Sequence, residues 1–76
     1  MLDRITSDPT ILGGKPIIRG TRISVEIILE WIASGASRDE IIRKHRHLTV
    51  EDVEQALAYA AASVRNEVLV TAEVGA

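Results

Sequence analysis

Residues 16–25, which read Pro-Ile-Ile-Arg-Gly-Thr-Arg-Ile-Ser-Val, decide how the first third of the chain folds. Two short runs rich in β-branched residues flank Gly20-Thr21, and glycine tolerates the positive φ angle that a tight turn requires. The pattern therefore predicts a short β-hairpin. An isolated two-stranded hairpin is only marginally stable in water, so we expect this one to pack on helices or to pair with a second copy of the chain.

The end of the same stretch predicts the start of a helix. The hydroxyl of Ser24 can accept a hydrogen bond from a backbone N–H of the first turn, and Gly35 stands where a left-handed residue commonly ends a helix. We therefore expect a first helix that runs to about Ser34. Its apolar residues recur at helical spacing: Val25, Ile28, Leu29 and Ile32, widened by Ile27 and Trp31.

A second, short helix is predicted from Ser37, because Ser37 and Glu40 have the spacing of a capping box. We expect this helix to end near Lys44 or Arg46. It is followed by a turn of about four residues.

A third and longer helix is predicted from Thr49, with Glu51 and Asp52 at the positive end of its dipole. Residues 67–76 fit a strand, a frayed helix end or a disordered tail equally well. We expect one domain over residues 1–76, with a turn and hairpin segment (1–24), a three-helix bundle (25–66) and a tail (67–76).

The expected apolar face of the third helix comprises Val50, Val53, Leu57, Ala60, Ala61 and Val64.

Composition narrows the class of protein. The chain has 76 residues, of which 46% are hydrophobic and 3% aromatic, and it contains no cysteine. A disulfide framework and a thiolate metal site are therefore excluded, and so small a core favours a homodimer. No apolar run approaches the roughly 18 residues of a membrane span, and the N-terminus does not resemble a signal peptide, so we expect a cytoplasmic protein.

Catalytic and cofactor motifs are not recognisable in the sequence. No nucleophile motif or carboxylate dyad is apparent, so we expect a protein that is not an enzyme and that needs no cofactor. The Gly13-Gly14-Lys15 stretch lacks the other elements of a phosphate-binding loop and precedes Pro16. His45 and His47 are two residues apart, which places them on different faces of a helix, so we expect no metal site.

Three capped helices with a short second helix are the layout of a helix-turn-helix, although many protein-interaction domains share it. The net charge is −2, which is not the basic character usual for a DNA-binding domain. Glu51, Asp52 and Glu54 open the third helix, where a recognition helix normally meets the bases. If DNA is bound, we expect cations of the hairpin and of the basic turn to contact it. The candidate DNA-binding residues are Lys15, Arg19, Arg22, Arg43, Lys44 and Arg46.

Residues 8–25, together with Gly35 and Leu48-Thr49-Val50-Glu51-Asp52-Val53, closely resemble the prokaryotic domain-of-unknown-function family 433. The resemblance covers nearly the whole chain, and its Gly-Gly-x-Pro and Arg-Gly-Thr-Arg elements are distinctive. The motif residues carry over as structural ones only: Gly13, Gly14, Pro16, Gly20, Thr21 and Arg22. The chain departs from the family at residues 44–47, Lys-His-Arg-His, where an aromatic residue and a proline are expected before Leu48.

The resemblance implies a mainly α, trihelical, homeodomain-like helix-turn-helix fold with an N-terminal β element. It also implies an antitoxin of a type II toxin–antitoxin pair, which neutralises a PIN-like ribonuclease toxin from a neighbouring gene and has operator DNA as a second partner. The acidic start of the third helix favours an alternative, a dimeric protein-interaction module that does not bind DNA.

Overall fold

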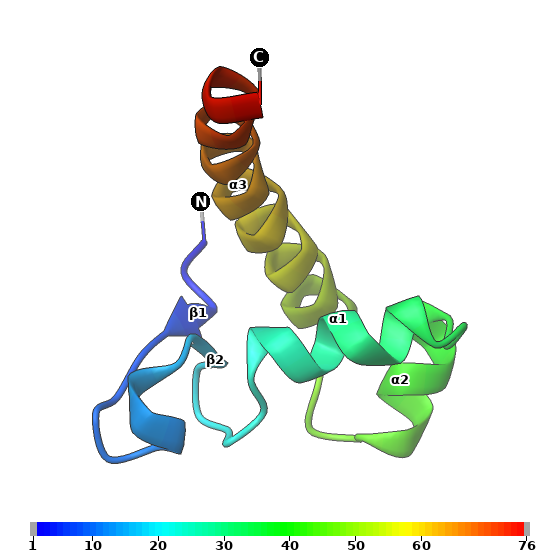
Figure 1. Ribbon diagram of the computed structural model, residues 1–76. Coiled ribbons are helices and arrows are strands. Elements are labelled where there is room, and N and C mark those ends of the chain that lie inside the picture. Colours follow the sequence, from blue (N-terminus) through cyan, green and yellow to red (C-terminus); the bar gives the residue numbers. More distant parts are fainter. Residues whose placement is uncertain (1, 76) are drawn as a thin grey trace.

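The computed structural model describes the backbone of residues 2–75 and the surroundings of side chains in residues 2–65. It confirms the mainly α fold with three helices and a short N-terminal β element (Figure 1). In chain order the elements are β1 (Ile5–Thr6), the 3-10 turn η1 (Leu12–Gly14), β2 (Ile17–Ile18), α1 (Val25–Ala33), α2 (Arg38–Lys44) and α3 (Val50–Gly75).

The tight turn expected after β2 forms at the expected place. The N–H of Thr21 donates to the carbonyl oxygen of Ile18 at 3.0 Å, and Gly20 has a φ of 80°. The N–H of Ile18 also donates to the carbonyl oxygen of Ile23 at 2.9 Å, which draws the two sides of the turn together.

The strand that pairs with β2 is not the one expected from the sequence. Instead, β2 pairs antiparallel with β1, with Ile5 opposite Ile18 and Thr6 opposite Ile17. The segment after the turn contributes only a single bridge, between Ile17 and Ser24. Because Ser24 caps α1, the chain leaves the extended conformation there, and the N-terminal residues supply the other strand.

Both ends of α1 follow the expected capping chemistry. The hydroxyl oxygen of Ser24 accepts a backbone hydrogen bond at 3.0 Å. At the other end Gly35, with a φ of 102°, donates to the carbonyl of Ile32 at 3.0 Å, and Ala36 donates to the carbonyl of Trp31 at 3.0 Å. This pair of bonds is a Schellman motif, which requires a left-handed residue at the glycine.

Reciprocal capping bonds also set the starts of α2 and α3. Ser37 and Glu40 exchange side-chain bonds to each other's backbone N–H at 3.1 and 2.8 Å, which confirms the predicted capping box. Thr49 and Asp52 do the same at 3.1 and 3.0 Å. From there α3 continues to Gly75, so the segment 67–75 is helical in backbone conformation.

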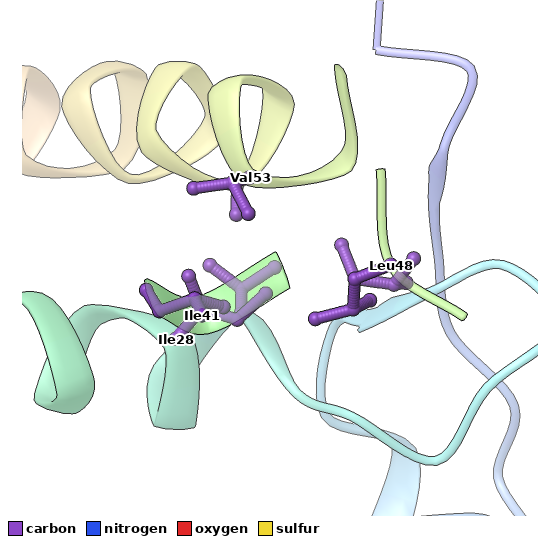
Figure 2. Close-up of a cluster of buried hydrophobic side chains, with 7 residues drawn as sticks. Ile28, Ile41, Leu48 and Val53 are labelled. Carbon is purple, nitrogen blue, oxygen red and sulfur yellow. The ribbon is translucent and has the colours of Figure 1, made fainter. Parts of the chain in front are cut away.

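The core lies where α1, α2 and the start of α3 meet beside the sheet, and Figure 2 shows Ile28, Ile41, Leu48 and Val53 pointing toward one another. The expected apolar face of α3 is wrong in part, since Val50 is 49% and Val64 54% exposed. Up to residue 65, the buried α3 residues are Asp52, Val53, Gln55 and Ala56. The capping bond of Asp52 directs its side chain inward, so that side of α3, and not the side of Val50, faces the core.

A polar network joins the N-terminal segment to α3. Nε of Arg4 donates to Oδ1 of Asp52 at 2.6 Å, and Asp52 is completely buried. The backbone N–H of Arg4 donates to Oε1 of Gln55 at 2.7 Å, and Nε2 of Gln55 donates to Oδ1 of Asp3 at 2.8 Å. These bonds hold β1 against α3.

The ion pair keeps Asp52 ionised. Burial by itself would raise the pKa of this carboxyl, but hydrogen bonds from Arg4 and Thr49 and the charge of Arg4 outweigh burial and lower the pKa below its ordinary value of 3.8. Since the native state binds the proton less readily than the unfolded chain does, Asp52 stabilises the fold above the unfolded pKa.

Replacing Asp52 should destabilise the fold. D52A removes the α3 capping bond and the acceptor for Arg4, and we expect it to lower the free energy of unfolding by about 2–4 kcal/mol, measured by urea denaturation. E54A is the control, because Glu54 is an exposed acid on the same turn, and its effect should stay within about 0.5 kcal/mol. Equal effects of the two substitutions would contradict the structural role of Asp52.

The contribution of Asp52 should disappear in acid. The stability difference between the unmodified chain and D52N should be fully present above pH 3.8 and should shrink as the pH falls through the lowered pKa of Asp52. Thermal unfolding followed by circular dichroism across this pH range measures the difference. A difference that stays constant with pH would show that the ionised carboxylate is not what stabilises the fold.

Candidate functional site

Cations near the turn are largely engaged within the molecule. Nζ of Lys15 lies 2.9 Å from Oε1 of Glu26 in an exposed ion pair, and this hydrogen bond raises the pKa of Lys15. Nε of Arg19 donates to the carbonyl oxygen of Asp3 at 2.9 Å. Arg22 is exposed and lines the same shallow depression as Lys15 and Glu26. These candidate DNA-binding residues therefore lie beside carboxylates and backbone carbonyls.

The second group of cations is more available to an outside ligand. Arg43 and Lys44 form the last turn of α2, and Arg46 follows in the segment that leads to α3. All three are exposed, and none forms an ion pair within the part of the chain whose side chains the structure describes. We call Arg43, Lys44 and Arg46 the α2 cations.

The six candidate cations do not form one patch. The depression with Lys15 and Arg22 includes Glu26, on the first turn of α1, whereas Lys44 lines a hollow with Trp31, on the last turn of the same helix. Figure 1 shows β2 at one end of α1 and α2 at the other. The two groups are therefore separated by the length of α1, so a small ligand meets only one of them.

A surface hollow of about 390 Å³ lies between the C-terminal ends of α1 and α2. The rings of Trp31 and His45 stack in its wall, with centroids 4.3 Å apart and planes 12° apart. This stack was not predicted from the sequence. The hollow is lined by Trp31, Ser34, Gly35, Ala36, Glu40, Ile41, Lys44 and His45.

The start of α3 presents acids to solvent. Glu51 and Glu54 are exposed, and Nε2 of Gln55 donates both to Asp3 at 2.8 Å and to Oε2 of Glu51 at 3.3 Å. Asp52, counted among these acids from the sequence, instead faces inward to Arg4. Phosphate groups would be repelled from this turn of the helix.

Among the residues that the structure describes, no group of three or more His, Cys, Asp or Glu side chains is placed to hold a metal ion. None of the described helices combines the length and the apolar character needed to span a membrane.

A protein-family model described as protein of unknown function (DUF433) matches residues 5–60. The chain belongs to the DUF433 family. This result confirms the resemblance drawn from the sequence. The DUF433 match ends close to Tyr59, which is also the last α3 residue that packs against the core in the described part of the helix.

Two other proteins are similar to this chain, one of them with a solved structure. A crystal structure of a DUF433 member protein from Anabaena variabilis is 29% identical, has a TM-score of 0.75, and is matched over 96% of this chain and 69% of its own. The uncharacterized protein y4eO of Sinorhizobium fredii is 37% identical over 59 residues, which are 78% of this chain. The match covers only 27% of y4eO, so its other three quarters have no counterpart in this alignment.

Proposed function

We propose that the protein is a cytoplasmic antitoxin of a type II toxin–antitoxin pair, that it neutralises a PIN-like ribonuclease toxin encoded by a neighbouring gene, and that the toxin binds along α3. The sequence resemblance motivates the antitoxin role. The observation that carries the proposal is the exposed apolar line of α3, formed by Val50, Leu57 and Val64.

This apolar line follows from helix geometry. Residues seven apart lie on nearly the same side of a helix, so Val50, Leu57 and Val64 are aligned along α3. Val50 and Val64 are about half exposed, and Leu57 between them is partly buried and also packs against the core. Apolar side chains that repeat along one side of a helix are the usual anchors by which a helix binds a groove of a partner protein.

The length of α3 supports the same proposal. Residues 61–65 are all exposed, and Figure 1 shows the C-terminal half of α3 extending away from the sheet and the other helices. The molecule is correspondingly elongated, with extents of 44 × 30 × 22 Å. A helix gains most of its stability from packing, so this half of α3 offers a partner a large surface to cover.

Co-expression with the product of the neighbouring gene tests the proposal. The two proteins should purify together in a fixed ratio, and the complex should lack the ribonuclease activity of the partner alone. V64D should weaken the complex at least about tenfold in a calorimetric titration, because it puts a carboxylate on the apolar line.

A62D is the matched control, because two residues turn a helix by about 200° and so put the same carboxylate on the opposite side of α3. It should bind as the unmodified chain does. Absence of any complex, or equal effects of V64D and A62D, would contradict the proposed toxin site.

The alternative is a homodimeric interaction module that uses the same apolar line. One reason for expecting a dimer is weakened, since β1 supplies the second strand of the sheet within the chain. Light scattering of the isolated chain at micromolar concentration distinguishes the two: a dimer that V64D dissociates, with no complex formed by the neighbouring gene product, would favour the alternative.

Nucleic-acid binding is a second candidate function, favoured by the exposed α2 cations. Acids at the start of α3 disfavour the usual docking of a recognition helix, so the proposed contacts are those of Arg43, Lys44 and Arg46 with phosphates. In this mode the protein contacts the phosphate backbone of operator DNA more than its bases.

Salt dependence measures these phosphate contacts. With three contacts, the logarithm of the association constant for promoter duplex should fall with the logarithm of salt concentration with a slope of about −3. R43A should make this slope shallower by about one, whereas R38A, which removes a cation from the other end of α2, should leave it nearly unchanged. A slope that R43A does not change would remove Arg43 from the interface.

A further inference from the structure

The hollow between the ends of α1 and α2 combines two kinds of surface that act on different parts of one ligand. Its wall carries the stacked rings of Trp31 and His45, and the exposed Lys44 also lines it. Arg43 and Arg46 are exposed on either side of this stretch of the chain. A ligand that fits this hollow has a flat, polarisable group for the rings and negative charge for the cations.

We propose that this hollow binds single-stranded nucleic acid, with one unpaired base stacked on the Trp31–His45 pair and the adjoining phosphates on the α2 cations. Aromatic rings beside cations are the usual means by which proteins hold single strands, because each base offers a flat face and each phosphate a charge. A duplex keeps its bases stacked on one another and can offer only its phosphates.

The carboxylate of Glu40, which also lines the hollow, is compatible with a nucleic-acid base as the ligand. Oε1 of Glu40 accepts from the backbone N–H of Ser37 at 2.8 Å, and its other carboxylate oxygen, Oε2, accepts no hydrogen bond from the residues whose side chains the structure describes. Hydrogen bonding from Ser37 lowers the pKa of Glu40, so the carboxylate is charged at neutral pH. Oε2 can then accept from the exocyclic amino group of cytosine, which uracil lacks.

This inference rests on the phosphate contacts proposed for the α2 cations and is independent of toxin binding. It adds a ligand class, the unpaired base, that operator duplex does not supply. The hollow is lined by residues within the range 31–45 and by none of Val50, Leu57 and Val64, although Ala36 in its wall also lines a neighbouring depression with Leu57.

Fluorescence of Trp31 is a direct test, because this is the chain's one tryptophan. The full chain is titrated at low salt with oligocytidylate, oligouridylate and their DNA equivalents, each about 12 nucleotides long. We expect single strands to quench the emission, with oligocytidylate binding about tenfold more tightly than oligouridylate. A duplex of equal length should bind without comparable quenching.

K44A should weaken the single-strand complex about fivefold or more, and R38A, an equal charge change at the opposite end of α2, should change it less than about twofold. Both residues are exposed, so neither substitution threatens the fold. Quenching by duplex equal to that by single strands would overturn the inference while leaving the phosphate contacts intact. If neither duplex nor single strands bind, the base stacking and the phosphate contacts are both contradicted. Equal effects of K44A and R38A would show that the hollow is not part of the binding site.

Discussion

The partly buried ion pair between Arg4 and Asp52 is the interaction on which the remaining architecture depends. Its two ends come from the residue just before β1 and from the first turn of α3, 48 residues apart in the chain. Because the Asp52 side chain also accepts a hydrogen bond from the backbone N–H of Thr49 at the start of α3 and is completely buried, the pair fixes the rotation of that helix about its axis. Val53 and Ala56 are thereby directed into the core, and Val50 and Val64 are directed away from it. The exposed apolar line of α3 is a consequence of this rotation.

The helix starts were predictable because their capping bonds join residues close together in the sequence. Contacts between segments far apart in the sequence could not be predicted. Ser24, Ser37 and Thr49 cap helices through neighbours three residues away, so a single sequence suffices to find them. The pairing of β1 with β2 depends on contacts between distant segments. The buried side of α3 was assigned wrongly in part because hydrophobicity alone placed Val50 inward, whereas an ionised side chain occupies the inward position.

The candidate sites were likewise predictable only where neighbouring residues in the sequence define them. The α2 cations were identifiable, since they follow one another along the chain and remain exposed in the structure. Lys15 and Arg19 also looked available from the sequence, but Glu26 and the carbonyl of Asp3 engage them. The stack of Trp31 on His45 had no signal in the sequence, because it forms only when the Schellman turn at Gly35 brings the ends of α1 and α2 together.

Charge and shape divide the surface into two regions with different uses. An acidic start and an apolar line make α3 suited to a protein partner, and the basic end of α2 beside an aromatic pair is suited to nucleic acid. The family match contains the basic end of α2 and the start of α3, and it ends at residue 60, where α3 leaves the core. The domain shared with other DUF433 proteins therefore holds the hollow, and the rest of α3 lies beyond it.

The central claim is that the globule stabilises α3 only as far as Tyr59 and that a partner protein covers the part of the helix beyond it. Amide hydrogen exchange along α3 tests this claim most directly. In the isolated chain, residues 53–59 should be strongly protected and residues 61–65 much less so, and adding the neighbouring gene product should raise protection at 61–65. Uniform protection along both ranges in the isolated chain, or no change at 61–65 in a confirmed complex, would contradict the account.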